Sequence, residues 1–202
     1  MNDHYYSNKP QSESRRRTFE ATLRGFALRF TSDAGVFSRD GVDYGSRVLI
    51  KEMEIPSDAR VLDIGCGYGP IGLTAARLAP QGHVTMIDIN ERAVELAAHN
   101  ASSNGIRNVS FAVSDLFTAV EGQRFDVILA NPPIRAGKAV VHRLLSEAYE
   151  FLRPGGSLWV VIQNKQGAPS ARAKLEEIYG DEQVRELGKD KGYRVYRSIK
   201  NI

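Results

Sequence analysis

The chain has little of three things: cysteine, histidine and long apolar runs. Its one cysteine, Cys66, cannot form an intrachain disulfide, so a disulfide-stabilised secreted fold is excluded and a reducing, cytoplasmic compartment is expected. The four histidines are scattered and show no metal-ligand spacing, so we predict no metal site. No apolar run approaches the roughly 18 residues that cross a membrane, and no basic-then-apolar signal pattern opens the sequence.

An excess of one charge sign is also missing, because the net charge of the 202 residues is only +3. The basic residues are nevertheless clustered in three stretches, residues 9–30, 131–143 and 185–200. Such clusters favour a phosphate-bearing partner, although the solvated faces of a mildly basic protein would look the same. The composition, with 42% hydrophobic and 25% charged residues, is that of an ordinary globular chain.

The N-terminal part differs in pattern from the rest. Residues 1–16 are polar and are predicted to form a mobile arm. Apolar residues alternate with polar ones over residues 19–30, which predicts a β-hairpin. A helix capped by Asp43 is predicted at residues 44–54. We therefore divide the chain into an N-terminal arm and β-hairpin, residues 1–42, and a main domain, residues 43–202.

The main domain reads as an α/β fold. Strands and helices alternate, which implies a mostly parallel seven-stranded sheet with helices on both faces. The last two strands are too close for a crossover helix and must pair antiparallel. Pro154-Gly155-Gly156 is predicted to close the helix before the fifth strand. Strands are predicted at 60–64, 84–87, 109–113, 125–130, 157–162, 183–187 and 193–198, and helices at 70–78, 91–103, 139–152 and 171–179.

A glycine-rich loop follows the first strand of this domain. Gly65, Gly67 and Gly69 alternate with other residues, and a helix begins at Pro70, where a missing N–H costs nothing. A strand, a glycine loop and a helix start form the usual cradle for a nucleotide-like ligand. The dinucleotide fingerprint G-x-G-x-x-G is not met, because Pro70 holds its last position. Asp63, just before the loop, disfavours a pyrophosphate and favours a cationic ligand.

Acidic side chains also follow the next two strands. Asp88 ends the second strand, where a carboxylate can accept both hydroxyl groups of a ribose. Asp115 follows the third strand and is followed by Leu116. With Asp63 these residues lie at the carboxyl ends of successive parallel strands, which is the edge where ligands bind in such sheets.

Asn131, Pro132 and Pro133 end the fourth strand. Proline carbonyls at this position are not consumed by helix or sheet pairing. The Asn131 side-chain carbonyl and the Pro132 carbonyl together can accept both hydrogens of a planar NH₂ group. Two such acceptors orient the amine for in-line attack on a methyl carbon, which is catalysis by positioning and electrostatics.

The aspartate and the G-x-G-x-G loop together resemble motif I of the class I S-adenosylmethionine-dependent methyltransferases. This resemblance implies a Rossmann-like fold, with Asp63 orienting the methionine end of S-adenosylmethionine. It also implies that Asp115 binds the adenine amino group and Leu116 covers the ring. The implied cofactor-binding residues are Asp63, Gly65, Cys66, Gly67, Gly69, Asp88, Ile89, Asp115, Leu116 and Asn131.

The Asn-Pro-Pro motif resembles that of amino methyltransferases acting on adenine N6, guanine N2 or glutamine N5, although Ile134 replaces their following aromatic residue. The run at residues 134–138, with Phe37-Ser38 and residues 43–46, is similar to the RsmC-like 16S rRNA guanine-N2 methyltransferases in their short single-domain form. The implied partner is ribosomal RNA or the small ribosomal subunit. The implied catalytic residues are Asn131, Pro132, Pro133 and Ile134, and the implied RNA-binding residues are Arg15, Arg16, Arg17, Arg135 and Lys138.

Two alternatives stay open at this point. The first is another amino methyltransferase, acting on adenine N6 of nucleic acid or on protein glutamine N5. The second is a non-catalytic module that binds S-adenosylmethionine and assists RNA assembly. The amine acceptors of Asn131 and Pro132 argue against the second, because a binding module does not need them.

Overall fold

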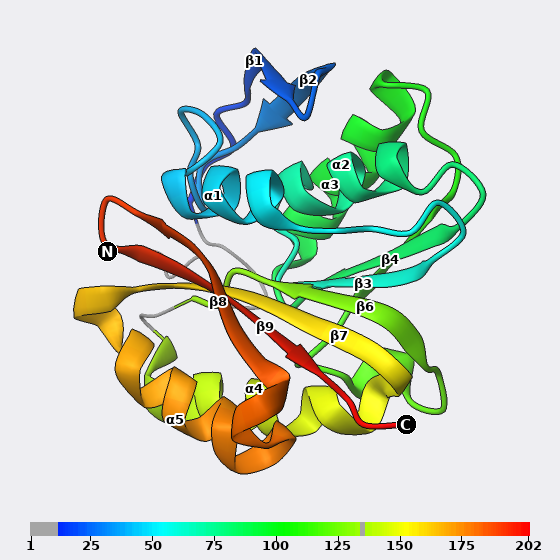
Figure 1. Cartoon of the computed structure of the whole chain (residues 1–202). Coiled ribbons are helices and arrows are strands. Elements are labelled where there is room, and N and C mark those ends of the chain that lie inside the picture. The colour runs from blue at the N-terminus through cyan, green and yellow to red at the C-terminus, as the bar shows by residue number, and fades with distance from the viewer. Residues whose placement is uncertain (1–11, 134–135) are drawn as a thin grey trace.

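The computed structural model describes residues 12–133 and 136–202, so the predictions for Ile134 and Arg135 lie outside the described residues. Its centre is a seven-stranded sheet with the order β5-β4-β3-β6-β7-β9-β8 (Figure 1). The pairs from β5 to β7 are parallel, whereas β9 runs antiparallel to both β7 and β8. This confirms the predicted mostly parallel, Rossmann-like sheet with an antiparallel last strand. The strands are β3 (Arg60–Ile64), β4 (His83–Asp88), β5 (Val109–Val113), β6 (Phe125–Ala130), β7 (Leu152–Gln163), β8 (Val184–Asp190) and β9 (Tyr193–Ile199).

Helices cover both faces of the sheet, with α1, α2 and α3 on one side and α4 and α5 on the other (Figure 1). Alternate residues of one strand enter opposite cores: Trp159 faces the first layer, and its neighbours Leu158 and Val160 face the second. Continuous apolar strands are therefore the expected result of burial on both sides. The helices are α1 (Tyr44–Glu52), α2 (Pro70–Leu78), α3 (Glu91–Ser103), α4 (Lys138–Phe151) and α5 (Ala168–Tyr179), and short 3-10 helices are η1 (Thr118–Val120), η3 (Asn164–Gln166) and η4 (Asp181–Gln183).

The predicted N-terminal hairpin is present as β1 (Arg17–Leu23) and β2 (Phe26–Ser32). Leu28 and Phe30 are buried in the same core as α1 and α3. The Asn100 side chain of α3 accepts from the Thr31 N–H at 2.7 Å and donates to the Thr31 carbonyl at 3.0 Å. The hairpin therefore packs on the helix layer formed by α1, α2 and α3 and shares its core, and the division of the chain at residue 42 stays a prediction.

The sequence pattern misplaces the start of β7. The predicted helix end at residue 152 is one residue beyond the end of α4 at Phe151, but β7 begins at Leu152, not at residue 157, and includes Pro154-Gly155-Gly156. Gly155 N–H donates to the Lys200 carbonyl, and Lys200 N–H donates to the Gly156 carbonyl, each at 2.9 Å. Lys200 directly follows β9, so these bonds satisfy the backbone groups of Gly155 and Gly156 beside the end of β9. The Pro-Gly-Gly sequence is therefore part of a strand here and not a turn.

Two helix boundaries are also wrong by a few residues. α5 begins at Ala168 rather than at residue 171, since Gly167 is left-handed and Pro169 suits a first turn. α1 ends at Glu52 rather than at residue 54 because Met53 leaves the helical conformation.

Candidate functional site

A cavity of about 550 Å³ opens at the carboxyl ends of β3, β4 and β6. It lies where the chain leaves β3 for β4 on one side while β6 pairs with β3 on the other. This switch in strand order opens a crevice between the loops, and ligands bind at such points in parallel sheets. Its volume is within the usual range of small-molecule sites.

The glycine loop forms one wall of the cavity. Gly65, Gly67 and Gly69 have φ of 73°, 56° and 106°. This is the left-handed region, in which residues with a side chain are strained. A Cβ at Gly65 or Gly67 would meet no atom within 4 Å, so backbone conformation, not crowding, requires glycine there. The loop is tied to β4, because the N–H groups of Gly65 and Cys66 both donate to the Ile87 carbonyl at 2.8 and 3.0 Å.

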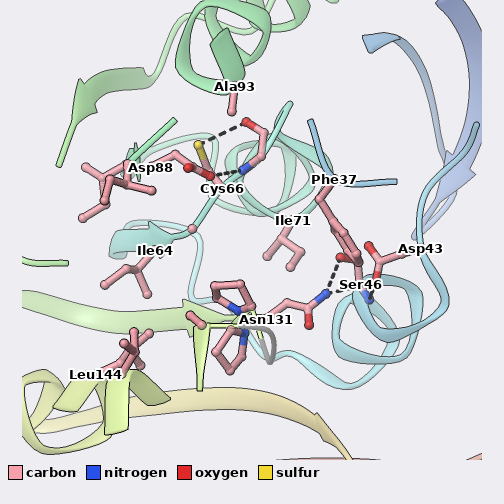
Figure 2. Close-up of a pocket in the computed structure, with 18 of the residues that line it drawn as sticks. Phe37, Asp43, Ser46, Ile64, Cys66, Ile71, Asp88, Ala93, Asn131 and Leu144 are labelled. Carbon is pink, nitrogen blue, oxygen red and sulfur yellow. Dashed lines mark hydrogen bonds between the residues drawn. The ribbon is translucent and has the colours of Figure 1, made fainter. Parts of the chain in front are cut away.

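Asp88, at the end of β4, lies beside this loop on the cavity wall (Figure 2). One carboxylate oxygen accepts from Gly67 N–H at 2.8 Å, and the other accepts from Asn90 N–H at 2.9 Å. Burial raises the pKa of the Asp88 carboxyl, and the backbone donors oppose that shift. The carboxylate thus fixes the loop while lining the cavity beside Ile89.

Asp63 lies behind the loop and does not line the cavity. It is buried, and its Oδ2 accepts from the Gly72 N–H of α2 at 2.8 Å, while its Oδ1 has no partner among the described residues. Burial, together with the charge of Asp88, raises the pKa of Asp63 to about 7. In this geometry Asp63 acts on the cavity by holding the first turn of α2, and its predicted role toward the cofactor stays a prediction.

The turn after β5 forms a further wall. The Leu116 backbone is left-handed, with φ 47°. Apart from glycine, residues other than asparagine and aspartate rarely adopt this conformation. Ser114 holds this turn, because its hydroxyl donates to the Leu116 carbonyl at 2.7 Å and accepts from Ala119 N–H at 3.0 Å. Asp115 and Leu116, the residues predicted to contact the adenine, line the cavity. Ser114 also lines it but was not predicted, because an isolated serine forms no recognisable motif.

Asn131 stands at the other end of the cavity, directly after β6. Its amide nitrogen donates to the Asp43 carboxylate and to the Ser46 hydroxyl, both at 3.0 Å. A carboxylate can only accept, so the NH₂ group must face Asp43 and the carbonyl oxygen must face away. Figure 2 shows this oxygen turned from Ser46 and Asp43. Pro132 and Pro133 line the cavity beside it.

Residues 27–197 match the family described as the methyltransferase small domain. The chain belongs to this family. It is a class I S-adenosylmethionine-dependent methyltransferase, as its motifs indicated. The uncharacterized protein YbxB of Bacillus subtilis is 50% identical over 99% of this methyltransferase and 100% of its own length.

Two further relatives are named for an activity. Ribosomal RNA small subunit methyltransferase C of Escherichia coli is 35% identical over 82% of this chain and 47% of its own length. The T. thermophilus 16S rRNA N2 methyltransferase RsmC, solved with AdoMet and guanosine, has a TM-score of 0.82 and 28% identity, covering 95% of this chain and 52% of that one. This methyltransferase therefore spans about half the length of both.

The described residues among those predicted to bind RNA lie in two places on the methyltransferase. Arg15, Arg16 and Arg17 are exposed before and at the start of β1, and Lys138 is exposed at the start of α4. Residues 12–16 are less free than the predicted mobile arm, because Ser14 and Arg15 N–H both bond the Asp33 carboxylate. Arg17 pairs with Asp40 at 2.7 Å on the exposed surface.

The sequence reading missed several residues of the cavity. Asp43 is recognisable as a helix cap, but its bond to Asn131 spans 88 residues. Phe37 and Tyr193 line the same end of the cavity from a loop and from the first residue of β9. Within the described ranges, no group of histidine, cysteine or acidic side chains suits a metal ion, and no helix has the length and apolar character to cross a membrane.

Proposed function

We propose that this methyltransferase moves a methyl group from S-adenosylmethionine to an exocyclic amine, guanine N2 of small-subunit ribosomal RNA, in the cytoplasm. The observation that carries the proposal is the orientation of Asn131. Its carbonyl oxygen is directed away from Asp43 and Ser46, and is therefore available to accept from an amine. The relatives named for small-subunit ribosomal RNA support the substrate class.

The cavity residues fit the cofactor. Asp88 presents a half-buried carboxylate that accepts from donors, as the two ribose hydroxyls require. The space over Gly65 and Gly67 leaves room for a ligand along the loop backbone, and Leu116 with Ile89 offers apolar surface to a purine ring. In this proposal Cys66 and Gly69 shape the loop, and Asp115 meets the adenine amino group.

The end of the cavity at Asn131, here called the acceptor end, positions the amine. The Asn131 carbonyl and the Pro132 carbonyl accept the two N–H groups of the amine, which holds its lone pair toward the methyl carbon. When bound, the cofactor would supply an electrophilic methyl group; the amine nitrogen held by these acceptors would take it, with the thioether as leaving group and the surplus proton released to water. No basic side chain is required, because the methylated amine is acidic at that stage.

In this proposal the RNA partner meets the basic residues that the sequence predicts to bind it. Guanine N2 lies in a groove of a paired helix, so the base must leave its stack to reach Asn131. Arg15, Arg16, Arg17, Arg135 and Lys138 would hold the flanking phosphates, which sets affinity but not base identity.

The test is methyl transfer from labelled cofactor to ribosomal RNA, isolated small subunits and DNA in parallel, followed by nucleoside analysis. We expect N2-methylguanosine from RNA or subunits. N6-methyladenine, or label found only in protein, would assign the enzyme to the other amino methyltransferases. Cofactor binding with no transfer to any of these substrates would contradict an enzymatic role.

A further inference from the structure

Phe37 is unusual among the apolar side chains at the cavity. It leaves 43% of its surface exposed and is the one aromatic residue among the large exposed apolar side chains of the described ranges. Figure 2 shows its side chain pointing into the cavity on the side of Ser46 and Asn131. An aromatic ring on the wall of a cavity is a candidate contact for a ligand, because small-molecule sites are lined mainly by apolar and aromatic side chains.

The loop that carries Phe37 is held on both sides of it. The Asn90 side chain donates to the Gly35 carbonyl at 2.9 Å, and the Ser38 hydroxyl donates to the Gly41 carbonyl at 2.6 Å. The Ser32 hydroxyl donates to the Arg39 carbonyl at 2.5 Å. These bonds hold the backbone on both sides of Phe37 at the cavity wall, which suits a preformed contact.

Tyr193 provides a second ring at the same end. It is the first residue of β9, paired with Gln163 at the end of β7, and both residues line the cavity. A Cβ at Gly45 would lie 2.9 Å from the Tyr193 ring, so the glycine of α1 allows this close approach. The ring centroid is 5.7 Å from that of Tyr44, and the half-buried ring thus packs against α1.

The turn before Tyr193 is tied to the site by polar contacts. Tyr44 donates its hydroxyl proton to Asp190 at 2.7 Å, and Asn164 N–H donates to the Gly192 carbonyl at 2.6 Å. These contacts join the β8–β9 turn to α1 and to the chain after β7. The position of the Tyr193 ring is therefore linked to α1, whose cap Asp43 holds Asn131.

We infer that Phe37 and Tyr193 form the subsite that receives the target base, a purine, at the Asn131 end of the cavity. A purine has two apolar faces that stack on aromatic rings and a polar edge that needs donors and acceptors. The rings serve the faces, while Asn131 and Gln163, both on the cavity wall, serve the edge. This inference rests on the proposed function and assigns the stacking contact that Ile134 does not offer.

The experiment compares Phe37→Ala, Tyr193→Ala and Tyr193→Phe with wild type on the RNA substrate. Leu187→Ala is the matched control, because Leu187 is another exposed apolar residue and lies on β8 outside the cavity. Each variant is measured for kcat/KM toward RNA, for cofactor dissociation constant and for melting temperature. Guanosine binding to each protein in the presence of S-adenosylhomocysteine is followed by saturation-transfer NMR.

We expect each alanine variant to lose roughly tenfold or more in kcat/KM and in guanosine binding, as the loss of one base stack predicts. Tyr193→Phe keeps its ring and should stay within about threefold of wild type, as should Leu187→Ala, with cofactor binding unchanged throughout. Alanine variants that stay folded and retain wild-type kcat/KM and guanosine binding would overturn the subsite.

The two proposals fail in different ways. Wild-type protein that binds guanosine, with binding lost in Phe37→Ala, but forms no N2-methylguanosine in RNA keeps the subsite and overturns the proposed reaction. Wild-type protein that forms N2-methylguanosine at rates unaffected by either alanine substitution keeps the reaction and overturns the subsite. Loss of methylation of a glutamine peptide in the same variants, with RNA inactive, would overturn both assignments.

Discussion

The carboxylate of Asp43 lies 3.0 Å from the side-chain nitrogen of Asn131, 88 residues further along the chain. The same oxygen, Oδ2, accepts from Ser46 N–H at 2.9 Å and so caps α1. One carboxylate therefore starts a helix and orients the amide that we propose as the amine acceptor. The stability of α1 and the geometry of the acceptor end are linked through this single side chain.

Asp43→Ala should lower kcat by roughly tenfold or more, because the Asn131 amide loses the partner that fixes its orientation. Loss of the cap should also lower the free energy of unfolding by about 1 kcal/mol. Asp43→Asn is the matched control, since its side-chain oxygen still accepts while the charge is lost. We expect it to retain more activity than the alanine variant. Steady-state kinetics with chemical unfolding checks this, and equal wild-type rates in both variants would contradict the link.

Asn131→Ala should remove at least about a hundredfold of activity while changing cofactor affinity by less than about tenfold. The variant keeps the backbone but loses one of two acceptors, so the amine is no longer held toward the methyl carbon. Single-turnover transfer and calorimetric cofactor binding separate the two effects. Turnover comparable to wild type would remove Asn131 from the mechanism.

Asp88→Ala should weaken cofactor binding before it affects the chemical step. The substitution removes the proposed ribose acceptor and also the bond that holds Gly67 N–H at 2.8 Å. Asp88→Asn retains one acceptor oxygen and should lose less affinity. Titration calorimetry with S-adenosylmethionine measures both, and an unchanged dissociation constant in Asp88→Ala would show that the ribose assignment is wrong.

Asp63 makes stability depend on pH. Its pKa is about 7 in the folded protein against 3.8 as the ordinary value, so between these values the folded state binds more protons than the unfolded state. The contribution of Asp63 to the free energy of unfolding should therefore be largest below about pH 4 and should fall as the pH rises toward 7. Above about pH 7 it should no longer change with pH. The total loss is on the order of a few kcal/mol.

Urea unfolding at pH 5, 6, 7 and 8 tests this for wild type and Asp63→Asn. The asparagine cannot ionise, so the wild-type decline between pH 5 and pH 7 should be largely absent in the variant. Comparing the two proteins cancels titrations that they share. Parallel pH profiles for the two would show that Asp63 has an ordinary pKa.

Lys138→Gln and Arg135→Gln should each reduce the salt dependence of RNA binding, by roughly one in the slope of log K against log salt concentration. The reason is that each cation neutralises about one phosphate. Lys51→Gln removes the same charge from the last turn of α1 and serves as the control. Filter binding across a salt series gives the slopes, and equal slopes in all variants would move the RNA contact to another face.

Local signals explain why so much of the fold was predictable. The bounds of β3, α2, α3 and β6 coincide with the predicted ones, because caps, a first-turn proline and apolar runs act over a few residues. The predicted start of β7 at residue 157 was wrong because the backbone partners of Gly155 and Gly156 come from Lys200, which no local pattern shows.

The sequence by itself determined the strand–loop–helix cradle, with left-handed glycines and carboxylates at successive strand ends, since these depend on backbone conformation and on the shared direction of parallel strands. Only the tertiary structure decided what meets Asn131. The Asp43 carboxylate, the Phe37 ring and the Tyr193 ring reach it from segments far apart in the chain. Their meeting depends on how α1 and the β8–β9 turn pack at one end of the sheet, and packing between distant segments leaves no periodic trace in the sequence.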